Sequence, residues 1–119
     1  MKRDMELARS ILLQIEKSPN FKSSIDMKFD GFSDEEVSYH IMLLNEGGLI
    51  IALNLSSGSD LYWIPERLTW QGNEFIEASR NTTAWNKTKE IMNKSGGFVF
   101  EIAKTILIEI IKNQLIVKI

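Results

Sequence analysis

The chain contains no cysteine. This absence excludes a disulfide framework, thiolate zinc sites, iron–sulfur clusters and cysteine nucleophiles. The chain also lacks the apolar segment of a signal peptide, because its first residues, Met1-Lys2-Arg3-Asp4, carry charges directly into a helical pattern. We therefore expect a cytoplasmic protein.

An excess of charge of one sign is missing as well. The chain has 14 Lys and Arg against 16 Asp and Glu, a formal net charge of -2. A nucleic acid would therefore have to be held by a local basic patch. The most apolar segment, residues 98–119, is interrupted by charged side chains, among them Glu101, Lys104, Glu109 and Lys112. A bilayer core would not tolerate them, so we expect no membrane partner.

Length and composition predict a single folded domain over residues 1–119. The chain has 119 residues, of which 44% are hydrophobic and 25% charged. These values are typical of one globular domain and far from those of disordered chains.

Apolar side chains recur every three to four residues in five segments, which predicts amphipathic helices. They cover residues 2–17, 33–46, 69–80, 82 or 83 to the stop at Gly96-Gly97, and 98–113. In the second helix, Ser33 and Glu36 have the spacing of a capping box, and Gly47-Gly48 supplies a left-handed stop. The side chains predicted to be buried in the second and third helices are Val37, His40, Ile41, Leu44, Trp70, Phe75, Ile76 and Ala78.

Strand patterns occupy the remaining segments. Ile25, Met27 and Phe29 alternate with charged residues, which predicts a short strand. Residues 49–55 and 61–68 are rich in strand-forming side chains and flank a turn-like segment, residues 56–60. This pattern predicts an antiparallel hairpin, in which Pro65 marks an edge strand or ends regular pairing.

The order of these elements is helix, short strand, helix, two-stranded hairpin and helix. It is typical of a winged helix, whose wing is the hairpin. We therefore predict an α+β fold, mostly α, with a winged-helix-like core and two additional C-terminal helices. The segment 98–119 either mediates dimerisation or covers the core.

Two segments, residues 39–50 and 67–75, show a helix leading into the wing and a Leu-Thr-x-x-Gly entry to the next helix. Together with residues 1–9 and 83–87 they resemble an uncharacterised winged-helix-like domain family of phages and bacterial prophage regions. The resemblance covers nearly the whole chain. It implies no activity, substrate or binding residue, because the family has none assigned.

No catalytic constellation is visible. His40 is the only histidine, and Glu36 lies one helical turn before it. A general base would need a nucleophile or metal partner that the sequence does not supply, whereas a hydrogen-bonded helix residue needs neither. The paired glycines lack the further glycines and lysine of phosphate loops, and Asn81-Thr82-Thr83 is read as a helix cap. We expect no enzyme activity, metal site or cofactor.

Double-stranded DNA is narrowly favoured as the partner because of the winged-helix analogy. Against it stand Asp34-Glu35-Glu36 at the start of the expected recognition helix, and a wing tip without Lys or Arg. The candidate DNA contacts are Lys28, Ser38, Tyr39, Ser57 and Arg67. The alternative is a protein-interaction module on the same scaffold that binds a host or phage protein.

A homodimer is also predicted. The C-terminal segment has more apolar side chains than one buried helix face requires, and such surfaces tend to be interfaces. The residues predicted to form this interface are Phe98, Ile102, Ile106, Ile110 and Leu115.

Overall fold

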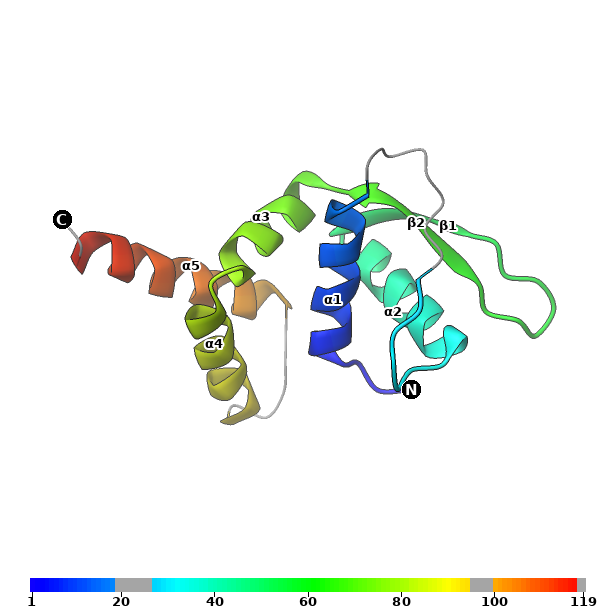
Figure 1. The fold of residues 1–119 in the computed structure, drawn as a ribbon, viewed down its shortest axis with the longest axis horizontal. Helices are drawn as coiled ribbons and strands as arrows, with labels where there is room; N and C mark the ends of the chain where they lie inside the picture. The colour runs from blue at the N-terminus through cyan, green and yellow to red at the C-terminus, as the bar shows by residue number, and fades with distance from the viewer. Residues whose placement is uncertain (19–26, 95–99, 118–119) are drawn as a thin grey trace. The chain divides into compact units, whose positions relative to one another are not determined.

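The computed structural model describes residues 1–18, 27–94 and 100–117 (Figure 1). The elements are α1 (Met5–Glu16), α2 (Asp34–Glu46), β1 (Ile50–Asn54), β2 (Trp63–Leu68), α3 (Trp70–Ser79), α4 (Thr82–Lys94) and α5 (Phe100–Val117). The predicted class, α+β and mostly α, is confirmed. The chain divides into two compact units, Met1–Asn73 and Glu74–Ile119, and the single domain over residues 1–119 stays a prediction.

The starts of α1 and α2 are determined by local hydrogen bonds. The carboxylate of Asp4 accepts a bond from the backbone N–H of Leu7 at 3.0 Å. At α2, the Ser33 hydroxyl accepts from the Glu36 N–H and the Glu36 carboxylate accepts from the Ser33 N–H, both at 3.1 Å. This is the predicted capping box, which satisfies two otherwise unpaired N–H donors.

The end of α2 directs the chain into β1. The Leu49 N–H donates to the Leu44 carbonyl at 3.0 Å, and the Gly48 N–H donates to the Asn45 carbonyl at 3.1 Å. This pair of bonds is a Schellman motif, and Gly48 has the left-handed φ of 78° that the motif requires. The predicted glycine stop is therefore confirmed.

The predicted hairpin is confirmed: β1 and β2 pair antiparallel, from Ile50 with Leu68 to Asn54 with Trp63. Pro65 pairs with Ala52 beside a register shift, and β2 continues past it, so regular pairing is interrupted by a bulge but does not end there. In this two-stranded sheet β2 is an edge strand, which was the other predicted possibility. The short strand predicted before the second helix is wrong over residues 27–29, which have no regular structure. Its first residue, Ile25, lies outside the described residues.

Three polar side chains of α2 link this helix to other elements of the first unit. Each accepts a hydrogen bond from a backbone N–H of another element. The bonds are Trp63 N–H to Ser38 Oγ at 3.2 Å, Asp4 N–H to His40 Nε2 at 2.8 Å, and Ala52 N–H to Asn45 Oδ1 at 2.9 Å. They link α2 to the start of β2, to the start of α1 and to the middle of β1. The core between these elements comes from the apolar faces of α1 and α2 together with Leu49 and Ile50.

The start of α3 packs tightly on the turn after α2. The Thr69 hydroxyl caps α3 by accepting from the Gly72 N–H at 3.1 Å, and it donates to the Gly48 carbonyl at 2.6 Å. The Thr69 N–H donates to the Leu49 carbonyl at 3.0 Å. A β-carbon on Gly72 would collide with the backbone oxygen of Leu49. In the Leu-Thr-x-x-Gly pattern, Thr69 therefore caps α3, and Gly72 allows the close approach to the Leu49 backbone.

Burial along α3 corrects one prediction. Phe75, Ile76 and Ala78 are buried as predicted, but Trp70 is 77% exposed. Trp70 precedes the buried Gly72 by two residues, and with 3.6 residues per turn this places it on the opposite side of α3.

In the second unit, α4 packs against α5. Asn81 caps α4 through its side-chain oxygen, which accepts from the Ala84 N–H at 3.0 Å, so its interpretation as a cap is confirmed. Trp85 is buried and meets Phe75 edge-to-face, with ring centroids 5.9 Å apart. The predicted helix over 98–113 is observed over Phe100–Val117, and the Gly96-Gly97 stop lies outside the described residues.

Replacing Gly72 with alanine tests the close approach of α3 to Leu49. We expect Gly72→Ala to lower the free energy of unfolding in urea by about 1–3 kcal/mol, because the added methyl group forces the backbone apart. Gly47→Ala is the matched control: its β-carbon would come no closer than 3.4 Å to a neighbouring atom. That change should leave stability unchanged or raise it by up to about 1 kcal/mol. Equal effects of the two substitutions would contradict the packing argument.

Candidate binding groove

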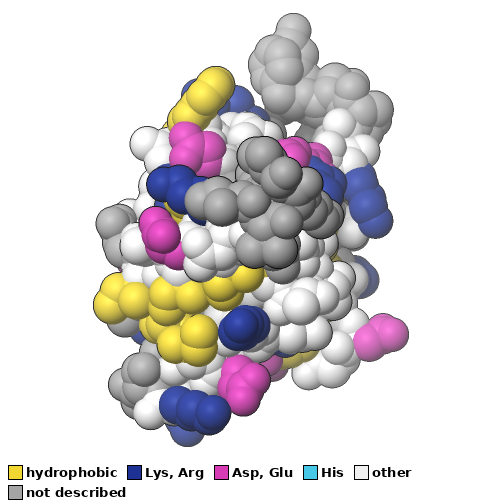
Figure 2. Space-filling view, turned by 90° about the vertical axis from the view of Figure 1, so that its left-hand side faces the viewer, with side chains coloured by type: hydrophobic (Ala, Val, Ile, Leu, Met, Phe, Trp, Pro, Cys, Tyr) yellow, Lys and Arg dark blue, Asp and Glu magenta, His cyan; other side chains and the backbone are white. Residues whose placement is uncertain are grey.

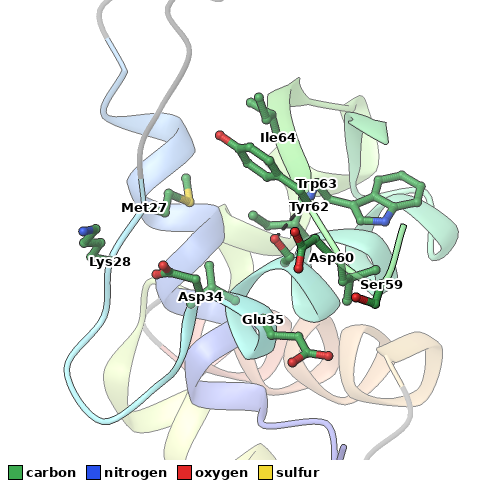
Figure 3. Close-up of a pocket in the computed structure, with 13 residues that line it drawn as sticks. Met27, Lys28, Asp34, Glu35, Ser59, Asp60, Tyr62, Trp63 and Ile64 are labelled. Carbon is green, nitrogen blue, oxygen red and sulfur yellow. Dashed lines mark hydrogen bonds between the residues drawn. The ribbon is translucent and has the colours of Figure 1, made fainter. Parts of the chain in front are cut away.

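A groove of about 570 Å³ lies in the first unit between the start of α2 and the returning arm of the hairpin. Its walls come from α2, from residues 59–64, and from residues 27 and 28 (Figure 3). The apolar and aromatic side chains that line it are Met27, Val37, Ile41, Leu61, Tyr62, Trp63 and Ile64. The volume is in the range of sites that hold a small ligand or a few side chains of a partner.

Acidic groups dominate the polar part of the groove. Asp34 and Glu35 come from the first turn of α2, and Asp60 comes from the hairpin turn (Figure 3). All three residues are exposed, and Lys28 is the one basic residue in the lining. The acidic residues of α2 also stabilise the positive end of the helix macrodipole. The described lining is therefore negative as well as apolar.

The Trp63–Ser38 hydrogen bond positions the two walls. Ser38 is 6% exposed, and its hydroxyl accepts from the Trp63 backbone N–H. This bond holds the start of β2 against the second turn of α2, so Tyr62 and Trp63 stand beside the acidic helix start.

Of the five residues predicted as DNA contacts, two lie in the same groove. Lys28 and Ser38 line the groove, whereas Tyr39 is half-buried with its ring edge-on to His40. Ser57 is exposed at the hairpin tip, where its backbone pairs with Asp60, and Arg67 is exposed at the hairpin base. DNA binding through this set stays a prediction. The sequence identifies Asp34 and Glu35 as groups that repel phosphate, but it does not show that they line a groove.

His40 is a structural residue in this geometry. It is 3% exposed; its Nδ1 lies 2.7 Å from the Glu36 carbonyl oxygen, and its Nε2 accepts the Asp4 N–H. Since one nitrogen donates and the other accepts, the imidazole has no nitrogen left for a substrate. The interpretation of His40 as a helix residue bonded to its neighbour is confirmed.

Comparison with known proteins identifies the family. A family model described as "Hypothetical protein (DUF2513)" matches residues 2–98. The chain belongs to the DUF2513 family. An uncharacterized protein of Haemophilus influenzae is similar to it, with 40% identity over 117 residues that cover 97% of this chain and 99% of the relative. No solved structure matches the chain.

Two further observations concern the described part of this DUF2513 chain. No three His, Asp or Glu side chains there come together in a way that would hold a metal ion. No helix in that part combines the length and the apolar character needed to cross a membrane.

The α5 face predicted to form a dimer is described in part. Ile102, Ile106 and Ile110 are spaced four residues apart, so they share one face of α5. Ile102 is 52% exposed and the other two are half-buried, whereas Ala103 and Leu107 are fully buried. On the face of the molecule that Figure 2 draws, hydrophobic side chains gather in a patch bordered by charged ones. Phe98 and the Leu115 side chain lie outside the described part, and dimerisation through α5 stays a prediction.

Replacing His40 tests its structural role. We expect His40→Ala to lower the free energy of unfolding by about 1–3 kcal/mol, because the Asp4 N–H loses its acceptor. His40→Gln keeps a side-chain acceptor of similar reach and should recover part of the loss. Urea unfolding followed by circular dichroism measures both variants. A His40→Ala protein as stable as the wild type would contradict this role.

Proposed function

We propose that the protein is a protein-binding module, and that its groove holds a partner segment in which basic side chains alternate with apolar ones. The observation that carries the proposal is the lining itself: three carboxylates stand around walls of aliphatic and aromatic side chains. The carboxylates of this lining attract Lys or Arg, and its apolar walls fit the apolar side chains between them.

The aromatic residues strengthen this match. Tyr62, Trp63 and Asp60 all line the groove, and the two aromatic rings point to opposite sides of the strand (Figure 3). Lys and Arg lay their aliphatic stems along apolar surfaces and keep their charged ends near carboxylates or aromatic faces. A basic residue of the partner would therefore find both kinds of contact in the groove.

The same groups weaken the case for DNA. A recognition helix presents its N-terminal residues to bases and phosphates, and here that end carries Asp34 and Glu35, both exposed. The hairpin turn, residues 56–60, adds Asp60 and no basic residue. These carboxylates would repel phosphates from the surface to which Lys28 also belongs.

The proposal also includes the type of fold, the origin of the protein and its location. The order α1, α2, β1, β2 and α3 supports a winged-helix-like core, used here to present a groove. The resemblance noted from the sequence supports a phage or prophage origin and a host or phage protein as the partner. The absence of cysteine supports a cytoplasmic location. We assign the protein no catalytic role.

Charge reversal in the groove tests the proposal. A display library of short random peptides, selected on the wild-type protein, should yield sequences in which Lys or Arg alternates with apolar residues. The double variant Asp34→Lys/Glu35→Lys should bind a selected peptide at least about tenfold more weakly, because the attraction becomes repulsion. Glu46→Lys is the control, since it reverses one carboxylate, where the groove variant reverses two, at the other, exposed end of α2.

Two outcomes would overturn the proposal. The first is a Glu46→Lys protein that loses as much affinity as the groove variant, which would show attraction by net charge alone. The second is micromolar binding of random-sequence duplex DNA that weakens steeply with salt and is abolished by Lys28→Glu/Arg67→Glu. That result would identify DNA as the partner.

A further inference from the structure

One face of the hairpin is apolar and exposed. Ile51, Leu53 and Leu55 are 38%, 47% and 51% exposed. Alternate residues of a strand point to the same side, so these three form a row along β1 and its extension. The Leu55 N–H donates to the Tyr62 carbonyl at 2.8 Å, which places Tyr62 (53% exposed) opposite the end of the row. We call these four residues the hairpin strip.

The strip faces away from the core of its unit. Ile50 and Pro65 are buried, and α1 and α2 contact the hairpin. In Figure 1 the hairpin reaches past the start of α2, so its outer part is not covered by either helix. A row of exposed aliphatic and aromatic side chains of this kind is typical of an interface.

The charges at the two ends of the strip are opposite. At the base, Arg67 pairs with Ile51 in the β-ladder and is exposed. At the tip, Asp60 pairs with Ser57 and is exposed as well. No charged side chain belongs to the strip between these ends. The exposed charges are thus Arg67 at one end and Asp60 at the other, with an apolar middle and the half-buried Glu66 beside Arg67 in the bulge.

We infer that a second copy of the chain covers the hairpin strip, with the two hairpins antiparallel about a two-fold axis near Leu53 and Leu55. A two-fold contact places the base of each hairpin over the tip of the other, so Arg67 of each copy meets Asp60 of its partner. The apolar rows then stack face to face at about 10 Å, the usual spacing of packed sheets. If the two hairpins lay parallel instead, the two Arg67 side chains would face each other, and so would the two Asp60 side chains.

This contact overlaps the binding groove at two residues. Ile51, Leu53, Leu55 and Arg67 do not line the groove, whereas Tyr62 and Asp60 lie on both surfaces. Substitutions at Leu53 and Arg67 therefore change the dimer contact without replacing a lining residue, although Leu53 pairs in the ladder with the lining residue Ile64.

Sedimentation equilibrium of the full chain at micromolar concentrations tests the inference. The wild type should be a dimer, and Leu53→Glu should raise the dissociation constant at least about tenfold. Leu55→Gln, which adds no charge, provides a second test and should weaken the dimer less. Ile102→Glu on α5 is the matched control, because that side chain is 52% exposed, and it should leave the dimer unchanged.

Exchange of the end charges tests the antiparallel arrangement. Arg67→Asp alone should weaken the dimer, and Arg67→Asp/Asp60→Arg should restore it, because the exchanged charges again face each other. A wild-type protein that stays monomeric would overturn the inference. So would a dimer that Ile102→Glu dissociates and Leu53→Glu does not, since that dimer uses α5. Failure of the double variant to recover affinity would overturn the antiparallel pairing.

Discussion

Hydrogen bonding by the side chains of α2 is the constraint on which the first unit depends. Ser38, His40 and Asn45 each accept a backbone N–H from another element. An N–H that loses its acceptor in a partly buried setting costs about 1–3 kcal/mol, so each bond strongly favours the observed packing. One helix thereby determines where α1 begins and where both strands of the hairpin lie.

The groove is a consequence of this arrangement. Ser38 holds the start of β2 beside α2, and the preceding residues, 59–62, then form the opposite wall. The acidic first turn of α2 contributes twice: Glu36 closes the capping box, while Asp34 and Glu35 make the groove negative. Stability of the helix and the charge of the surface arise from the same short stretch of sequence.

Features that depend on neighbouring residues were predictable. The capping box at Ser33, the stop at Gly48 and the cap at Thr69 each involve residues within a few positions, so spacing alone reveals them. Trp70 was misplaced because a single aromatic at the start of a helix can be assigned to either face. The predicted strand at Met27 rested on three alternating residues, too short a pattern to establish pairing.

The groove required contacts that spacing does not encode. His40 and Asp4 are 36 positions apart, and Trp63 and Ser38 are 25 positions apart. Asp34 and Asp60 look like ordinary surface acids in the sequence, and only folding brings them around the same apolar walls. The sequence therefore shows which acidic and apolar residues are present, but not that they come together in one groove.

The most direct measurement is an amide chemical-shift titration of the isotope-labelled protein with a short peptide in which arginine alternates with leucine. A peptide with glutamate in place of arginine is the control. If the groove binds basic and apolar segments, the arginine peptide will shift the amides of Asp34, Glu35, Asp60 and Trp63, and the glutamate peptide will not. Shifts that avoid these residues, or that are equal for the two peptides, would contradict the account.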